Sequence, residues 1–210
     1  MCWNEDVSLN TFLFSGFVLI LIVYNNTYTK YKIKELDTWM YVLIFSFIFM
    51  QLIEYFIWKN IKTTYNHFFT RCALLLLCFQ PIASLMILKN QHVRNVLLLF
   101  YCLTVLPYFL YKLFINSIYS VKQGHLHWNF GNISIYICIL WLFFFFYSLV
   151  AEKKWVLLIP FVLTFLATCV LYVKTKTIGS MWCWSVNTIM LYYAGYLLFY
   201  LPFLEKSALC

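Results

Sequence analysis

The stretch TWMYVLIFSFIFMQLIEYFIW, residues 38–58, decides the fold class of this chain. It is apolar almost throughout, and Glu54 is its only charged residue. A helix of about 20 apolar residues spans the hydrocarbon core of a bilayer. Backbone N–H and C=O groups in lipid must be bonded within the segment, so a run of this length predicts a membrane-spanning helix.

Comparable runs follow one another along the rest of the chain. The seven apolar runs are 7–25, 38–58, 68–88, 93–116, 129–150, 154–174 and 180–203. The composition is 64% hydrophobic and 10% charged, far less charge than a soluble domain carries. The sequence therefore predicts an all-α polytopic membrane protein, a bundle of seven transmembrane helices that forms a single domain over residues 1–210.

The net charge of +8 does not indicate a nucleic-acid partner. Ten of the 15 Lys and Arg residues fall outside the apolar runs and the other five lie within five residues of the end of a run, where anionic lipid headgroups attract them. No basic helix or stripe is present that could follow a phosphate backbone. The expected partner is the lipid bilayer.

Seven crossings would place alternate connections on the same face of the membrane. The N-terminus and the connections 59–67, 117–128 and 175–179 would then share one face. The segments gathered there would include Met1–Asn4, Gly124–Trp128 and Gly179–Trp184. This common face is the predicted location of a functional site.

The second run carries a polar stripe at helical spacing. Gln51, Glu54 and Trp58 stand at i, i+3 and i+7, which puts them on one helix face. Glu54 is the only acidic residue inside any run, and a carboxylate at this depth is expensive unless it is paired or protonated. It is therefore expected to face the interior, either as a functional group or as a packing partner of Arg71.

Other runs repeat this arrangement. The further polar positions are Asn4, Ser8, Thr11 and Ser15 in the first run and the segment before it, Gln80 and Ser84 in the third, Asn129, Asn132 and Tyr136 in the fifth, and Ser180, Cys183 and Asn187 in the seventh. Most of these stripes begin at the shared face and fade toward the other, which predicts a polar pocket that aromatic residues close from below. The alternative is that these side chains join helices by hydrogen bonds. The predicted pocket consists of Glu54, Gln51, Gln80, Ser180 and Asn187, with Trp3, Trp58, Trp182 and Trp184 as its walls.

His125 and His127 form a second candidate site. In an extended segment an H-x-H pair directs both rings to the same side, which suits chelation. Two histidines do not complete a zinc site, but Cys2, Cys183 and Glu54 lie on the same predicted face. Soft ligands of this kind would suit zinc or copper(I). The alternatives are that the histidines are ordinary interfacial residues and that Cys2 and Cys183 form a disulfide.

Several short motifs resemble those of a known family. The motifs are Met-Cys-Trp at 1–3, Ser-Leu-Asn-Thr-Phe at 8–12, Gln-Leu-Ile-Glu at 51–54, Gln-Pro-Ile-Ala-Ser-Leu at 80–85, Gly-His-Leu at 124–126 and Ser-Met-Trp-Cys-Trp at 180–184. With them the chain resembles, nearly end to end, a family of uncharacterised multi-span membrane proteins encoded by large DNA viruses of protists. The resemblance implies a multi-pass protein of a host endomembrane or a virion membrane, and it implies no activity or cofactor.

Three functions fit these patterns. The first is binding or transport of a small polar ligand, ion or lipid headgroup that enters from the N-terminal face. The second is a metal-dependent membrane hydrolase that acts on lipid, with a metal-bound water as nucleophile. The third is a structural or interaction protein of a viral membrane. Whether the protein is an enzyme is left open. A retinal pigment is not expected, because the run 180–203 contains no Lys for a Schiff base.

Overall fold

The computed structural model describes residues 4–30, 32–33, 36–114, 120–122, 124–127 and 133–203. Helices dominate this part of the chain. In chain order the elements are α1 Glu5–Tyr28, α2 Thr38–Lys59, α3 Tyr65–Leu85, α4 Gln91–Thr104, α5 Leu106–Phe114, β1 Ser120–Lys122, β2 His125–His127, α6 Ile135–Ala151, α7 Trp155–Tyr172, α8 Ile178–Val186, α9 Ile189–Gly195 and the π-helix η1 Tyr196–Tyr200.

Short polar residues set where several helices begin. The Asn4 side chain accepts a hydrogen bond from the backbone N–H of Val7 at 2.8 Å, and Asp37 accepts one from Met40 at 3.1 Å. Asn90 does the same at the start of α4. Each cap satisfies an N–H that has no partner within its own helix.

Among the described residues, six helices are long and apolar enough to cross a membrane. They are α1, α2, α3, the α4–α5 pair over Gln91–Phe114, α7, and the α8–α9–η1 series over Ile178–Phe203. The fifth predicted run forms α6, which has only 17 residues. At 1.5 Å per residue it is about 26 Å long, somewhat short of a hydrocarbon core of about 30 Å. The all-α class and a multi-pass membrane protein are confirmed, whereas the count of seven spanning helices is not.

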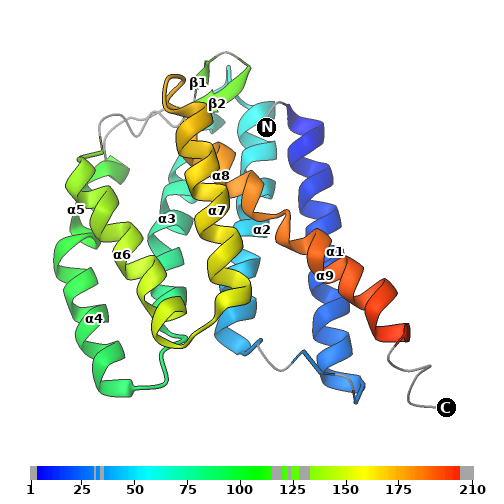
Figure 1. Cartoon of the computed structure of the whole chain (residues 1–210). Helices are drawn as coiled ribbons and strands as arrows, with labels where there is room; N and C mark the ends of the chain where they lie inside the picture. Colours follow the sequence, from blue (N-terminus) through cyan, green and yellow to red (C-terminus); the bar gives the residue numbers. More distant parts are fainter. Residues whose placement is uncertain are drawn as a thin grey trace.

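The helices pack side by side, with α2 and α3 in the middle of the contact pattern (Figure 1). α2 contacts α1, α3 and α8, and α3 contacts α5 and α6 as well. Aromatic rings fill the interior: Phe47 lies 5.7 Å from Phe145 and 5.2 Å from Phe161, centroid to centroid. The sequence has only 5 Gly and is 22% aromatic, so its helices pack through large side chains instead of close backbone crossings.

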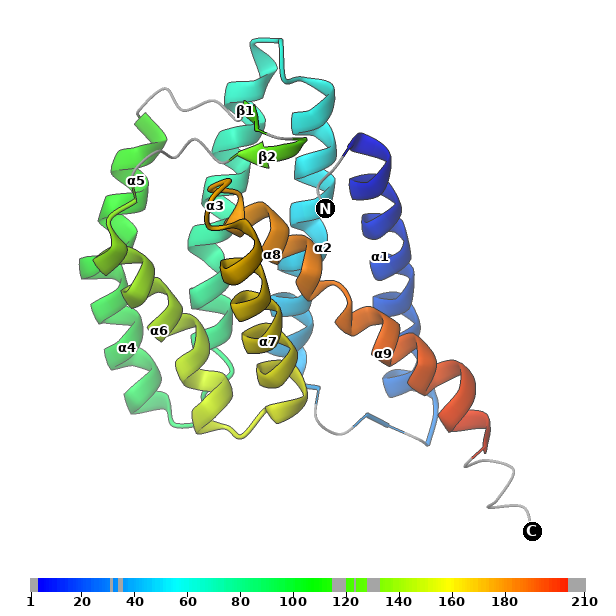
Figure 2. The same ribbon diagram turned by 45° about the horizontal axis from the view of Figure 1, so that its top comes forward.

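The predicted gathering of distant segments at one end is visible in the ribbon. The start of α1, the connection between α2 and α3, the β1–β2 hairpin and the start of α8 lie at the same end, and the C-terminal helix points to the other (Figures 1 and 2). We call the first the N-terminal end and the second the opposite end. Figure 2 also shows α9 leaving the bundle beside α1.

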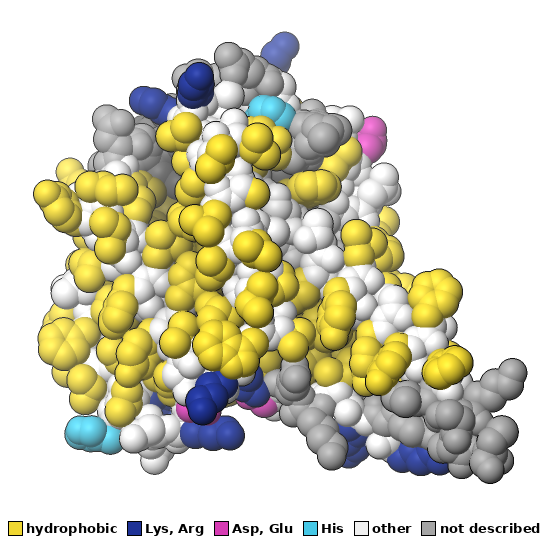
Figure 3. Space-filling model, in the orientation of Figure 1, with side chains coloured by type: hydrophobic (Ala, Val, Ile, Leu, Met, Phe, Trp, Pro, Cys, Tyr) yellow, Lys and Arg dark blue, Asp and Glu magenta, His cyan; other side chains and the backbone are white. Residues whose placement is uncertain are grey.

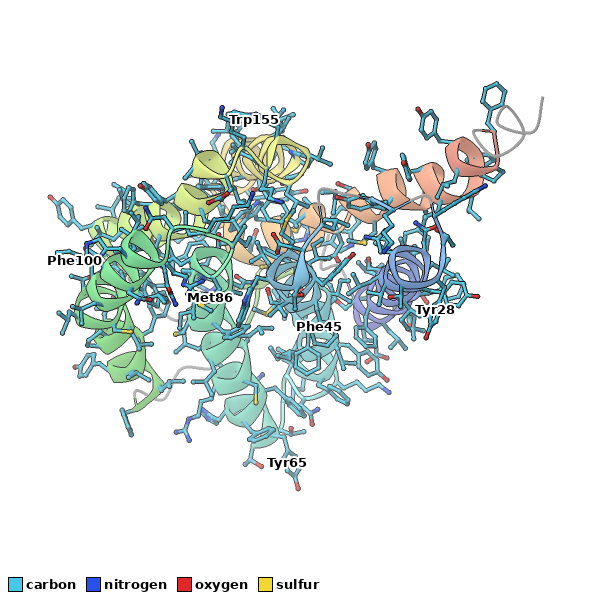
Figure 4. All side chains as sticks on the ribbon, turned by 90° about the horizontal axis from the view of Figure 1, so that it is seen from below. Tyr28, Phe45, Tyr65, Met86, Phe100 and Trp155 are labelled. Carbon is cyan, nitrogen blue, oxygen red and sulfur yellow. The ribbon has the colours of Figure 1, made fainter. Side chains whose placement is uncertain are left out.

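The outer surface is apolar in the middle and charged at its two ends, as a bilayer requires. On the face drawn in Figure 3, hydrophobic side chains cover the middle, while Lys, Arg, Asp, Glu and His gather at the two ends. Viewed from below, the rings of Tyr28, Tyr65, Phe100 and Trp155 lie around the outside of the bundle (Figure 4). All four are exposed, as side chains that face lipid or the interface would be.

Candidate functional site

The polar stripes of α1, α2 and α8 meet near the N-terminal end. α1 and α2 are antiparallel neighbours, and α8 contacts α2. Counted from the helix ends at 1.5 Å per residue, Glu54 and Cys183 each lie about 8 Å deep, and Ser15 lies about 15 Å deep. All three are buried. Side chains that the sequence predicted to share one site therefore share one region of the interior.

Glu54 is the centre of this region. Its side chain is 0% exposed, and the Gln51 side-chain amide Nε2 donates a hydrogen bond to Glu54 Oε2 at 3.0 Å. Cys183 lies close enough to interact electrostatically with the carboxyl group. Arg71, the alternative partner, is exposed. We call Gln51, Glu54 and Cys183 the Glu54 cluster.

Several polar atoms of this region have no hydrogen-bond partner within the described part of the chain. They are Gln51 Oε1, Ser15 Oγ and Trp58 Nε1, all fully shielded from solvent. Buried polar atoms in folded proteins nearly always have a partner, from protein or from ordered water. The arrangement thus offers both acceptors and a donor for a water molecule or a small polar ligand.

The β1–β2 hairpin packs against the N-terminal end of the bundle. Val121 pairs with Leu126 and Lys122 with His125, and Gly124 completes the turn at a φ of +77°, a left-handed value that favours glycine. Leu126 is fully buried, and the Ser180 hydroxyl donates to its carbonyl at 2.8 Å. Ser180 therefore joins α8 to the hairpin.

The aromatic residues predicted as walls lie on two sides of this region. Trp182 is buried among rings, 5.7 Å from Phe47 and 5.9 Å from Trp141, and its Nε1 donates to the carbonyl of Phe161 at 3.1 Å. Trp184 points toward α1, where its Nε1 donates to Thr11 Oγ1 at 3.1 Å. We call the rings of Phe47, Trp141, Phe145, Phe161 and Trp182 the aromatic layer.

Asn187 occupies the break between α8 and α9. Its side-chain amide donates to the carbonyl of Cys183 at 2.8 Å and reaches the carbonyl of Phe47 on α2 at 3.5 Å. The Asn187 backbone N–H bonds Trp184 instead of Cys183, so the side chain replaces the missing helical donor. Irregular backbone of this kind is tolerated in a spanning helix where nearby side chains satisfy the freed groups.

Gln80 is buried but lies apart from the Glu54 cluster. It is 15 positions into α3, so it lies about 22 Å from the N-terminal end, roughly 15 Å deeper than Glu54. It lies beyond the depth of the Glu54 cluster, although it was predicted as part of the same pocket.

The described residues do not gather a metal site. His125 and His127 stand at alternate positions of β2, which confirms the extended H-x-H geometry. Within the described ranges, no three His, Cys, Asp or Glu residues are grouped closely enough to hold a metal ion. Burial lowers the pKa of His125, whose ring meets that of Tyr172 edge-on at 5.4 Å. Cys2 and Trp3 lie outside the described residues, so their roles as ligand, wall or disulfide partner stay predictions.

A separate open cleft of about 450 Å³ lies at the opposite end, where α1 turns into α2. Its lining includes Asn26, Lys32, Asp37 and Tyr41. Asp37 also lies 3.6 Å from the ammonium group of Lys154. The sequence did not predict this cleft, because its lining residues stand in no regular spacing.

Trp141 and Ser148 were not predicted as functional residues, and both form hydrogen bonds with groups of α3. Trp141 Nε1 donates to the carbonyl of Leu77 at 3.0 Å, and Ser148 Oγ lies 2.6 Å from Ser84 Oγ. The sequence did contain a signal for a donor such as Trp141: Pro81 has no N–H, so the carbonyl four residues earlier needs another donor. Which residue supplies that donor depends on helix packing.

The fold defines the class: an integral, multi-pass α-helical membrane protein, with a buried acid, Glu54, in one of its helices. Comparison with protein-family models, with curated proteins and with solved structures finds no match. The resemblance to proteins of protist viruses therefore remains a prediction.

Proposed function

We propose that this protein binds or transports a small polar solute or ion, and that Glu54 takes up and releases a proton as part of that process. The observation that carries the proposal is the complete burial of Glu54 inside a membrane helix. Ionisable residues at such positions are costly, and in membrane proteins they mark ion pathways and proton relays. The shielded, unmatched atoms of Gln51 and Ser15 support a polar occupant beside it.

The surrounding residues then have distinct roles. Gln51 orients the carboxyl group, and Cys183 and Asn187 supply polar contacts from α8. The hairpin covers the N-terminal end, where Trp3 and Trp58 would line the entrance. The aromatic layer, which includes Trp182, closes the site from below, as hydrophobic constrictions do in other pores.

We further propose that α6 crosses the membrane, which would give seven crossings. Support comes from its course in Figure 1, which runs alongside α7 between the two ends of the bundle. Its 17 residues require only slight local thinning of the bilayer. A host endomembrane or a virion membrane is the proposed location.

Proton flux into liposomes tests the assignment of Glu54. The protein is reconstituted with a trapped pH-sensitive dye, a pH gradient is imposed, and the membrane potential is clamped with potassium and valinomycin. Glu54→Gln keeps the size of the side chain but cannot release a proton, so flux should fall to the level of empty liposomes. Asp6→Asn is the matched control, because it removes an exposed acid at the same end.

Two results would contradict the proposal. Flux in Glu54→Gln equal to that of the unmodified protein would remove Glu54 from the pathway. Absence of flux in the unmodified protein, with any of several cation gradients, would favour a structural role in the membrane instead.

A further inference from the structure

A second group of buried polar side chains lies between α3 and α6, on the side toward the opposite end. Gln80 and Ser84 are four residues apart on α3, and Ser148 and Glu152 are four residues apart at the end of α6. This spacing places each pair on one helix face. Ser84 and Ser148 meet where α3 and α6 are in contact, and Gln80 and Glu152 stand one turn away from them on the same helix faces, so the four side chains define a file. We call it the α3–α6 file.

Gln80 is the unexplained member of the file. Its side chain is 0% exposed, and neither its amide oxygen nor its amide nitrogen has a hydrogen-bond partner within the described residues. An amide left unbonded in an apolar interior is strongly destabilising. Two donors and two acceptor positions in such a place call for a polar ligand, and water is the smallest that can serve both.

The helix is irregular at this point. Pro81 removes the N–H that would bond the carbonyl of Leu77, and Trp141 of α6 donates to that carbonyl instead. Spanning helices tolerate proline where neighbouring helices or ordered waters satisfy the freed groups. Trp141 thus satisfies the freed carbonyl, whereas the side-chain amide of Gln80, next to the proline, has no partner among the described residues.

The lower members lead to the surface at the opposite end. Ser84 Oγ donates to the carbonyl of Phe145 and shares a hydrogen bond with Ser148 Oγ at 2.6 Å. Glu152 lies one turn beyond Ser148, and its Oε1 accepts from the backbone N–H of Lys89 at 2.9 Å. Its side chain is 15% exposed, so the file ends at solvent.

We infer that Gln80 binds ordered water within the membrane and that the α3–α6 file is the route between the membrane centre and the opposite end. The second part rests on the proposed function of Glu54. Counted along their helices, Phe47, Phe145 and Phe161 of the aromatic layer lie about 15–18 Å from the N-terminal end, between the depths of Glu54 and Gln80. A proton reaching Gln80 would protonate bound water, and that water would return to neutral by passing a proton toward Glu152.

Whether Gln80→Met raises or lowers the midpoint of unfolding tests the water site. Methionine has nearly the same shape and no hydrogen-bonding group. If the amide is dry and unpaired, removing it should raise the midpoint of unfolding in detergent. If it binds water, the variant should unfold at a lower midpoint and reduce proton flux by about tenfold or more, since each tenfold step corresponds to one 1.4 kcal/mol rise in the barrier.

Ser46→Ala is the matched control, because Ser46 is also buried in a spanning helix but donates only to Leu43 of its own helix. Ser148→Ala should reduce flux, and Ser46→Ala should not. A raised midpoint in Gln80→Met, or a flux no lower than that of Ser46→Ala, overturns the inference.

A measurement on the unmodified protein covers the case in which Gln80→Met does not fold. Radiolysis of bound water oxidises neighbouring side chains, and the buried indole of Trp141 bonds the carbonyl of Leu77, about one helical turn from Gln80 on α3. Oxidation of Trp141 supports the water site, and its absence overturns it. The midpoint of unfolding and the oxidation of Trp141 do not depend on Glu54, so a failure of Glu54→Gln to change flux would remove the proposed function and leave the test of the water site intact.

Discussion

Replacing Trp141 with Phe should expose how α3 tolerates Pro81. In the folded protein, Trp141 Nε1 donates to the carbonyl of Leu77 at 3.0 Å. That carbonyl is free because Pro81 offers no N–H four residues later. If this explanation is right, the value of the indole N–H depends on the proline, and the two substitutions should not act independently.

The size of the effect follows from what each variant removes. Trp141→Phe loses one hydrogen bond within the membrane, which stabilises by about 0.6 kcal/mol on average and about 1.7 kcal/mol at most. It also loses roughly 1 kcal/mol of packing from the larger ring, which stacks on Phe145 at 5.2 Å. The total cost should be about 2 kcal/mol. After Pro81→Ala the restored N–H at position 81 bonds Leu77, so Trp141→Phe should then cost about 1 kcal/mol less.

Denaturant unfolding in mixed micelles would measure the stability of the unmodified protein, the two single variants and the double variant, which together form a double-mutant cycle. Trp182→Phe is the control, because Trp182 also donates to a backbone carbonyl, that of Phe161, which Pro81 does not affect. Its cost should be the same with and without Pro81. Should the cost of Trp141→Phe also be unchanged by Pro81→Ala, to within about 0.3 kcal/mol, the explanation is refuted.

Three further predictions concern the two ends of the bundle. Burial lowers the pKa of His125, so the folded state takes up its proton less readily than the unfolded state. The stability of the fold should therefore decrease as pH drops below about 6.5. Thermal unfolding measured against pH would show this dependence, and His125→Gln should reduce it. Ser180→Ala removes a hydrogen bond of about 1 kcal/mol, so amide hydrogen exchange at Leu126 should become about fivefold faster. An unchanged exchange rate would mean that Ser180 does not hold the hairpin. Asn26→Leu removes the hydrogen bond to the Tyr41 hydroxyl at the opposite end and should cost about 1–2 kcal/mol in unfolding free energy without altering proton flux.

The helices could be predicted from the sequence because lipid leaves the backbone few choices. A long apolar run must satisfy its own N–H and C=O groups, so length and polarity alone locate it. The run 38–58 became Thr38–Lys59, and 154–174 became Trp155–Tyr172. The run 129–150 was predicted less accurately: its helix begins later, at Ile135, and ends at Ala151.

The candidate site could be predicted only in part. Helical spacing correctly placed Gln51 and Glu54 on one buried face of α2, since a carboxyl group in lipid must face inward. Spacing could not predict that Ser180 would bond Leu126, because that contact joins residues 54 positions apart. Spacing also could not predict how deep a residue lies in the bundle: Gln80 is as buried as Glu54 but belongs to a different part of the bundle.

The two polar regions share a property that helps to explain why they persist. Gln80 precedes Pro81 in α3, and Asn187 occupies the break between α8 and α9, so each buried amide adjoins a place where the helical hydrogen bonds are interrupted. A sequence selected only for a stable bundle would gain by replacing the unbonded amide of Gln80 with an apolar residue and by restoring regular helices at both places, because lipid makes unpaired polar groups costly. The Asn187 amide is hydrogen-bonded, but it bonds a carbonyl that a regular helix would satisfy without it. In membrane proteins such backbone is tolerated where it lines a cavity or a pathway. Two such interruptions, one near Glu54 and one next to Gln80 at the start of the α3–α6 file, therefore fit the proposed path between the two ends of the bundle.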